Sequence, residues 1–255
     1  KTIPMRIQRL NMDNSWYFAI NGLGLLVDPW LEGEEVDFFR WFNTQWHRTP
    51  PLRVEEVPAH DLVLVTQKYP DHFHRQTLLR LNPRRVVGPA SIERELRSLL
   101  PSAEIIPLGK DRPRVEFGGV SIQWYPSTRP FGPVYEAFAI SDQQETVFIA
   151  PHGYIPGKGW KAPETPVKVL VSTFNDFRLP FFLGGTIAPG VEGLSRLVEK
   201  LAPARIVATH DEDKHAIGLV MKLAKVRRIS AADLGIYPQF KGRVLELDDY
   251  RSVDV

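Results

Sequence analysis

Three side chains that can bind metal ions or carry protons lie close together in the first third of the chain. They are Asp71, His72 and His74, and they follow an apolar run at residues 62–65 that predicts a buried strand. Reactive side chains of α/β proteins commonly lie on loops at strand ends, because the scaffold is rigid and the side chains meet solvent. The arrangement therefore indicates a functional site. The alternative is an ordinary turn in which Asp71 caps a helix that begins near Thr77.

This loop resembles the signature of the metallo-β-lactamase superfamily, in which a strand ends in Thr-His-x-His-x-Asp-His and the loop supplies most ligands of a one- or two-metal site. Thr66, Asp71 and His72 match that signature. Gln67 and Tyr69 stand at its two earlier histidines, which in the family hold the first metal together with a later third one. Glutamine is a poor zinc ligand and tyrosine is a rare one. The resemblance therefore implies that the first-metal half of the site is lost.

The resemblance continues along most of the chain in the same order. Asp28 lies in a Leu-Val-Asp-Pro-Trp-Leu run typical of the family, which implies that it orients His72 or a metal-bound water; the alternative is an Asp-Pro strand end. Ser127 stands where relatives have the histidine of a Gly-His-Thr motif. His152 replaces the aspartate that bridges two metals, and His210 matches the final histidine ligand of the second metal.

The retained positions imply a site for at most one divalent metal ion. Asp71, His72, His152 and His210 would hold zinc, or else manganese or iron, and a vestigial site without metal is the alternative. In such a hydrolase the ion lowers the pKa of a bound water and polarises the scissile group. Tyr69 is expected to donate to the developing oxyanion. Asp71 is an alternative general base.

The other histidines have simpler interpretations. We expect His74 to contact and orient a metal ligand without binding the ion itself; the alternative is an accessory ligand or acid. His47 and His60 are expected at the surface. His215 is expected to be a solvated or capping imidazole on the helix predicted after His210.

Composition predicts one globular domain over residues 1–255. With 43% hydrophobic residues the chain can bury one large core. Its 32 basic and 30 acidic residues leave a net charge of +2, which offers no global field for nucleic acid or an anionic membrane. The absence of cysteine excludes disulfides, thiolate zinc sites and iron–sulfur ligation by this chain.

No apolar run reaches the roughly eighteen residues of a membrane span, and the first residues have no secretory pattern. We therefore predict no membrane span and a cytoplasmic location. Similar sequences occur in cyanobacteria and plant chloroplasts, which makes the chloroplast stroma the alternative. Because the chain starts at Lys1, removal of a targeting segment stays open.

Hydrophobic patterns predict a mixed α/β domain, and the resemblance implies the four-layer αββα sandwich of the superfamily. Asn21-Gly22 is a strong hairpin signal between strands at residues 16–20 and 23–27. Helices are predicted at residues 74–81, 91–100, 190–201 and 213–225. Further strands are predicted at residues 61–66, 85–88, 103–107, 114–117, 120–125, 135–141, 146–150, 167–171, 206–209 and 243–247.

Two segments outside the matched motifs carry aromatic side chains. Residues 36–46 form an irregular stretch with five aromatics, and residues 174–189 contain Gly184-Gly185. We predict that Trp41, Arg129 and Arg178 contact the substrate, because aromatic side chains bury large areas and guanidinium groups bind phosphate or carboxylate. The alternative for the aromatics is a satellite core cluster.

Two functions are consistent with these features. The first is a metal-dependent hydrolase of the lactonase-like branch, which acts on a small-molecule ester, lactone or phosphoester. The second is a superfamily member that has lost catalysis and serves as a binding or assembly factor, with residues 36–46 facing a protein partner. Nucleic-acid processing is disfavoured by the nearly balanced charge. The oligomeric state is not predicted.

Overall fold

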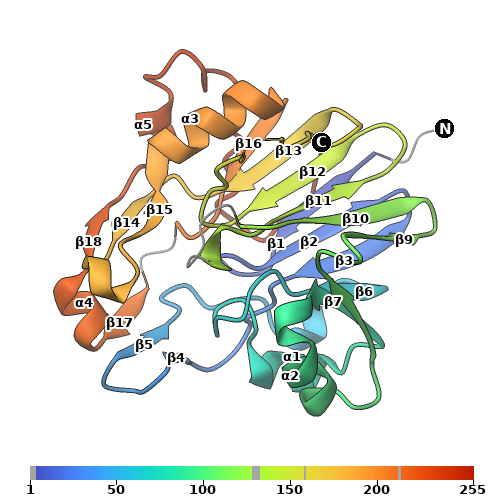
Figure 1. The fold of residues 1–255 in the computed structure, drawn as a ribbon, viewed down its shortest axis with the longest axis horizontal. Helices are drawn as coiled ribbons and strands as arrows, with labels where there is room; N and C mark the ends of the chain where they lie inside the picture. The colour runs from blue at the N-terminus through green and yellow to red at the C-terminus, as the bar shows by residue number, and fades with distance from the viewer. Residues whose placement is uncertain (1–3, 128–132, 158, 212–213) are drawn as a thin grey trace.

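Two large β-sheets form the centre of the molecule (Figure 1). The computed structural model describes residues 4–127, 133–157, 159–211 and 214–255. The seven-stranded sheet has the order β19-β1-β2-β3-β6-β7-β8, with β1 Arg6–Arg9, β2 Trp16–Ile20, β3 Leu23–Val27, β6 Leu62–Leu64, β7 Arg85–Pro89, β8 Glu104–Leu108 and β19 Val253–Asp254. The six-stranded sheet has the order β16-β13-β12-β11-β10-β9, with β9 Arg114–Phe117, β10 Val120–Tyr125, β11 Ala137–Ser141, β12 Thr146–Ala150, β13 Val167–Ser172 and β16 Arg205–Ala208.

Helices cover the outer faces of both sheets. The α-helices are α1 Arg75–Leu81, α2 Glu93–Leu99, α3 Gly190–Leu201, α4 Leu219–Leu223 and α5 Ala231–Leu234, and the 3₁₀ turns are η1 Val54–Glu56, η2 Ala90–Ile92, η3 Pro133–Tyr135 and η4 Phe181–Leu183. The apolar face of α3 packs on the six-stranded sheet. Helices α1 and α2 pack on the seven-stranded sheet. The inner faces of the two sheets enclose the largest apolar cluster, so the predicted αββα sandwich is confirmed.

Local sequence explains the first hairpin. Strands β2 and β3 pair in the predicted register through Asn21 and Gly22, whose φ angles are 47° and 80°. Two left-handed residues in succession are what a type I′ hairpin turn requires. The burial of β2 alternates along the strand, as expected for a strand with one face on the core.

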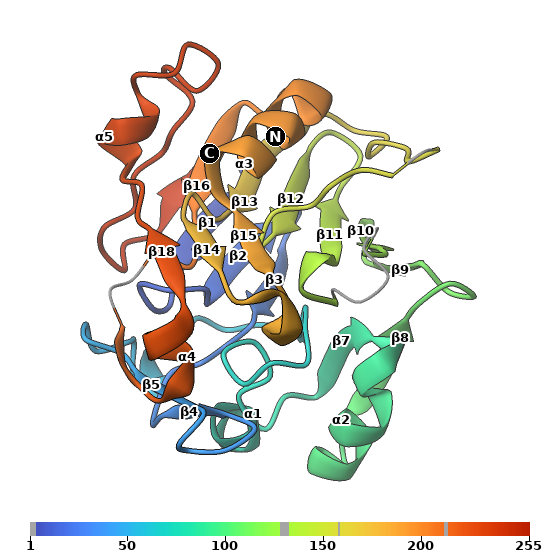
Figure 2. The same ribbon diagram turned by 60° about the vertical axis from the view of Figure 1, so that its left-hand side comes forward.

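Two small three-stranded sheets lie beside the sandwich, on the left of Figure 1 and again near one another in Figure 2. One has the order β15-β14-β18, with β14 Asp176–Arg178, β15 Thr186–Pro189 and β18 Lys225–Arg227. The other has the order β17-β5-β4, with β4 Glu35–Asp37, β5 Asn43–Trp46 and β17 His215–Ile217. The stretch at residues 36–46, expected to be irregular, thus contributes two strands.

The prediction of a helix at residues 213–225 is wrong. The described part of that segment forms β17, the short helix α4 and the start of β18. The break falls at Gly218, whose φ is 120° and where an added Cβ would lie 2.5 Å from the carbonyl oxygen of Phe42. Pairing of β17 with β5 outweighs the helical spacing, so His215 stands on a strand.

The terminal strand predicted at residues 243–247 is also wrong. The described residues there make a single bridge, between Val244 and Ile206. The last strand is instead β19, which pairs antiparallel with β1. Among the described residues, no helix has the length and apolarity needed to cross a membrane.

Candidate metal site

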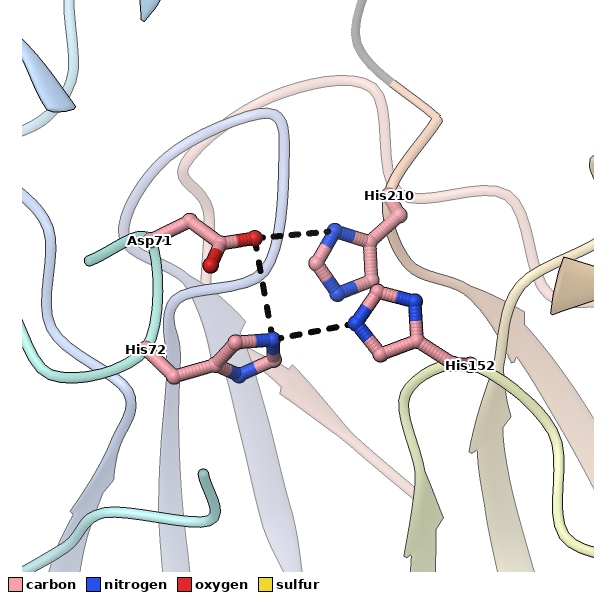
Figure 3. Close-up of side chains that lie close together, drawn as sticks. All are labelled: Asp71, His72, His152 and His210. Atoms are coloured by element: carbon pink, nitrogen blue, oxygen red, sulfur yellow. Dashed lines mark hydrogen bonds and ion pairs between the residues drawn. The ribbon is translucent and has the colours of Figure 1, made fainter. Parts of the chain in front are cut away.

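Four side chains with metal-ligand chemistry converge at one edge of the sandwich (Figure 3). Asp71 and His72 come from the loop between β6 and α1, His152 follows β12, and His210 follows β16. One potential ligand atom from each residue lies within 4.8 Å of all the others. The structure therefore brings together the four residues predicted to be ligands, although their segments are distant in the sequence.

The distances within the group suit coordination of one ion. His72 Nε2 lies 3.3 Å from His152 Nε2 and 3.6 Å from Asp71 Oδ2. His210 Nδ1 lies 3.8 Å from Asp71 Oδ2. Two nitrogens that are each about 2.0–2.1 Å from a tetrahedral zinc ion are about 3.4 Å apart. The two facing Nε2 atoms match that separation.

Hydrogen bonds fix the orientation of His72. Its Nδ1 donates to Asp28 Oδ2 at 2.7 Å. Thr66 donates to the same carboxylate twice, from its backbone N to Oδ1 at 2.7 Å and from Oγ1 to Oδ2 at 2.5 Å. All three residues are buried. Asp28 therefore holds His72 in the tautomer that turns Nε2 toward the other ligand-type residues, as expected for the carboxylate partner of a metal-binding histidine.

The charge of this environment acts strongly on His72. Burial alone would lower its pKa, but the carboxylates of Asp71 and Asp28 outweigh burial and raise the pKa to about 9. The neighbouring His152 behaves oppositely. Burial, together with the charges of His210 and His72, holds the pKa of His152 well below its usual range. One imidazole is thus prepared to be neutral and to offer a lone pair.

His210 is held mainly through its backbone. The backbone N–H of His210 donates to the carbonyl oxygen of Asp13 at 2.9 Å, and Asn175 Nδ2 donates to the carbonyl oxygen of His210 at 2.8 Å. Its ring lies against His152, with centroids 4.4 Å apart and planes inclined by 21°. His210 Nε2 is buried without a hydrogen-bond partner among the described residues. An imidazole with an unused buried nitrogen next to two other imidazoles and a carboxylate fits a divalent metal ion.

The donor set also limits which metals fit. It consists of three imidazoles and one carboxylate, without thiolate. Zinc, manganese and iron all accept such ligands. The geometry therefore agrees with a divalent cation and does not choose among these three.

The cluster is surrounded by further charged groups, and these were not predicted from the sequence. Asp13 is buried and accepts a hydrogen bond from Lys214 Nζ at 2.8 Å; burial would raise its pKa, but Lys214 and His210 hold it well below the usual range. Glu35 is buried, and neither of its carboxyl oxygens has a partner among the described residues. Burial, reinforced by Asp71, raises the pKa of Glu35 well above its ordinary value. The four polar residues among positions 11–15, just before a strand, were the available signal for Asp13.

A cavity of about 330 Å³ opens beside the cluster and includes Asp71, His152 and His210 in its lining. Both small sheets contribute to its walls. Apolar residues of the lining include Phe42, Phe177, Leu179, Leu183, Ile187 and Val226. Tyr69 also lines the cavity, where burial and the charge of Asp37 raise the pKa of its phenol.

The remaining predicted site residues lie elsewhere. His74 caps α1, because its Nδ1 accepts from the backbone N of Thr77 at 3.3 Å, so Asp71 as the helix cap is wrong. Trp41 is 65% exposed, and Arg178 pairs with Asp176 at 2.7 Å; neither residue belongs to the cavity lining. Arg129 lies outside the described residues. A substrate contact by these three side chains stays a prediction.

A family model described as a β-lactamase superfamily domain matches residues 10–210 of the chain. This match includes all four residues of the cluster. No curated protein matches.

Solved structures share the fold over almost the whole chain. An isothiocyanate hydrolase from Delia radicum gut bacteria has a TM-score of 0.68 at 18% identity, covering 97% of this chain and 98% of its own. Igni18, a metallo hydrolase from Ignicoccus hospitalis, has a TM-score of 0.69 at 14% identity and 98% coverage of both chains. The metallo-β-lactamase fold protein YhfI from Bacillus subtilis has a TM-score of 0.64 at 13% identity and 99% coverage of both. At these identities the likeness concerns the fold alone.

Proposed function

The chain belongs to the β-lactamase superfamily, and from this premise we propose that it is a hydrolase dependent on a single divalent metal ion, with zinc as the first candidate. The observation that carries the proposal is the convergence of Asp71, His72, His152 and His210 beside a cavity. These four residues would hold the ion. The substrate would be a small-molecule ester, lactone or phosphoester whose scissile group reaches the floor of the cavity.

A bound divalent ion supplies Lewis acidity, which polarises a scissile group and makes water more acidic. The chain supplies the positioning. Asp28 orients His72 by accepting from its Nδ1. Tyr69 lines the cavity, and the pKa of its phenol is raised, so the phenol stays protonated. It can therefore donate a hydrogen bond to an oxygen that gains negative charge during the reaction. The Asp71 carboxylate can alternatively accept a proton from the attacking water.

One feature supports a single ion over a pair. Gln67, at the place of a first-metal histidine in the resemblance, is buried, and its Nε2 donates to the carbonyl oxygen of Val134 at 2.9 Å. This side chain therefore has a structural use in connecting two segments. Tyr69, at the second such place, lines the cavity and presents a phenol where the family has an imidazole.

Metal content tests the proposal. The purified protein would be stripped with a chelator, reloaded separately with zinc, manganese and iron(II), and measured by mass spectrometry of the elements. We expect about one ion per chain for the native sequence, and almost none for the double variant His72→Ala, His210→Ala. His60→Ala is the matched control, because His60 lies outside the cluster and contacts the carbonyl oxygen of Pro58.

Two ions per chain would contradict the single-ion site, and none under any loading would contradict the hydrolase. Turnover of an ester, lactone or phosphodiester by the double variant at the native rate would also contradict it. The loaded native protein and the control variant should hydrolyse the same substrate equally.

A second candidate function is a binding or assembly factor without catalysis. The observation in its favour is the exposure of Phe38, Phe39 and Trp41, at 76%, 61% and 65%. Exposed aromatic side chains are enriched at protein interfaces. A protein that takes up no metal yet keeps its fold would favour this function.

A further inference from the structure

The cavity beside the four ligand-type residues has two unlike sides. The polar side carries the carboxyl groups of Glu35, Asp37 and Asp71. The apolar part of the lining comes mainly from η4, α4 and the β15-β14-β18 sheet, whereas β4 and β5 of the other small sheet contribute polar residues. A ligand that fills the cavity must therefore present a polar end to one side and hydrocarbon to the other.

The charges of the lining disfavour a negatively charged ligand. Apart from its histidines, the described lining has two cationic side chains, Lys214 and Arg228, against three carboxyl groups. Lys214 Nζ is engaged by Asp13 at 2.8 Å, and Arg228 is exposed. A phosphate or carboxylate away from the reacting end would lack a buried cationic partner and would meet carboxyl groups instead.

Glu35 adds a specific requirement on the polar side. Its side chain is buried within the lining, with both oxygens unpartnered among the described residues. Whether protonated or ionised, a carboxyl group offers hydrogen bonds and no positive charge. A neutral ligand with a hydroxyl or amide group can satisfy it in either state, whereas an anion can pair only with the protonated form.

The apolar side continues beyond the cavity. Phe38, Met221 and Val226 belong to the lining and are also exposed, at 76%, 45% and 44%. Next to Leu183 of the lining, Phe181 and Phe182 are exposed at 95% and 79%. Apolar surface thus runs from the cavity to the outside, which suits a chain longer than the cavity itself.

Building on the proposed function, we propose that the substrate is an uncharged ester or lactone with an apolar alkyl or aryl chain. The apolar chain of the substrate lies against the β15-β14-β18 sheet, η4 and α4, and its reacting group lies at the cluster. Phosphate-bearing compounds are excluded as good substrates. This keeps two of the three classes that the proposed function admits, the ester and the lactone, and removes the phosphoester.

Binding without turnover tests the ligand class. Metal-free protein would be loaded with N-phenyl-1-naphthylamine, an uncharged fluorescent probe, and titrated with 1-alkanols of four to ten carbons. We expect each added methylene to lower the Kd by about three- to fourfold until the chain reaches the outside. A Kd independent of chain length would overturn the inference.

Variants locate the binding surface. Ile187→Asn, within the lining, should raise the Kd for 1-octanol about tenfold or more. Met221→Gln is a second variant that keeps the fold because the side chain is 45% exposed, and it should raise the Kd several-fold. The matched control is Leu79→Asn, since Leu79 is 55% exposed on α1 and outside the lining. Equal effects of all three variants would contradict a specific site.

Turnover by the metal-loaded protein then separates the two proposals. p-Nitrophenyl esters from acetate to octanoate should show kcat/KM rising with chain length, and p-nitrophenyl phosphate should be hydrolysed at least a hundredfold less efficiently. Preference for the phosphate would overturn the substrate class while leaving the hydrolase intact. Chain-dependent binding without any hydrolysis would overturn the hydrolase and leave the apolar ligand class supported.

Discussion

The ends of the large sheets and the two small sheets face the same cavity but are built differently. On the large-sheet side, the buried Asp28 carboxylate accepts from His72 and from Thr66, and these hydrogen bonds determine the position of His72. On the small-sheet side, most strands are three residues long, and exposed apolar side chains lie on two of them, on the turn between β4 and β5, on η4 and on α4. The contrast teaches that buried hydrogen bonds position the ligand-type residues, while the surface proposed to select the substrate consists of short elements with exposed side chains.

Backbone conformation sharpens this contrast. Asp28 and His210 follow strand ends with φ angles of 48° and 53°, in the left-handed region. Residues with a Cβ occupy that region at a cost of about 1 kcal/mol. Contacts on several sides hold both residues in this conformation. Such contacts are expected where the direction of a side chain is worth the cost of a strained backbone.

The largest effect is expected from Asp28→Asn. Asparagine tolerates the left-handed backbone, so the variant isolates the lost carboxylate. The amide cannot accept from Thr66 and His72 on both oxygens as the carboxylate does. Metal affinity should fall about 10- to 100-fold, and the free energy of unfolding should fall by on the order of 2 kcal/mol.

Chelator competition and urea unfolding measure these two quantities. Thr66→Val, which removes only the hydroxyl donor, should give a smaller loss in both. If Asp28→Asn bound metal as tightly as the native chain, rigid positioning of His72 would not matter for the site.

A smaller effect is expected from a titration on the large-sheet side. Burial raises the pKa of Glu136, just before β11, to about 7, against about 4.3 when unfolded. Between these values the folded state binds more protons than the unfolded state, so stability falls as pH rises from about 4.3 to about 7 and then levels off. The two pKa values set an upper limit of about 3.7 kcal/mol, and because the side chain is only partly buried we expect a loss of about 1 to 2 kcal/mol.

The readout is the difference in free energy of unfolding between the native chain and Glu136→Gln, measured in urea from pH 4.5 to 8. The variant lacks this titration, so the difference should change with pH only below about 7. Parallel curves for the two proteins would show that Glu136 is not desolvated.

The smallest effect is expected on the small-sheet side. The double variant Phe181→Ser, Phe182→Ser should change the free energy of unfolding by less than about 0.5 kcal/mol, because both rings are almost wholly exposed. Thermal unfolding of the two proteins measures this. A loss above about 1.5 kcal/mol would mean that these rings are packed in solution, and the two sides of the cavity would then be equally rigid.

Sequence patterns were sufficient for the long strands of the sandwich. Apolar runs such as that of β12, together with the turn signal at Asn21, predict elements whose burial is local information. The small sheets were not predictable in this way. Strand β18 is exposed at all three positions, and β17 exists through pairing with β5, about 170 residues earlier in the chain.

The candidate site, like the fold, could be predicted from the sequence only in part. Its four ligand-type residues follow strands or match the family signature, so the sequence could group them. Glu35 and Lys214 could not be found, since each stands in a segment without a motif. Lys214 meets Asp13 across 201 positions of the chain, and only the fold reveals that contact.

Such distant pairing has a consequence for how the chain is made. Arg9 is buried and donates to both carboxylate oxygens of Asp211, 202 residues away. Synthesis runs from the N-terminus, so Arg9 and Asp13 emerge from the ribosome long before Asp211 and Lys214 exist. Burying either charge alone is costly. The first strand is therefore expected to settle late, when the same C-terminal stretch also delivers His210, so that the site is completed in one final step of folding.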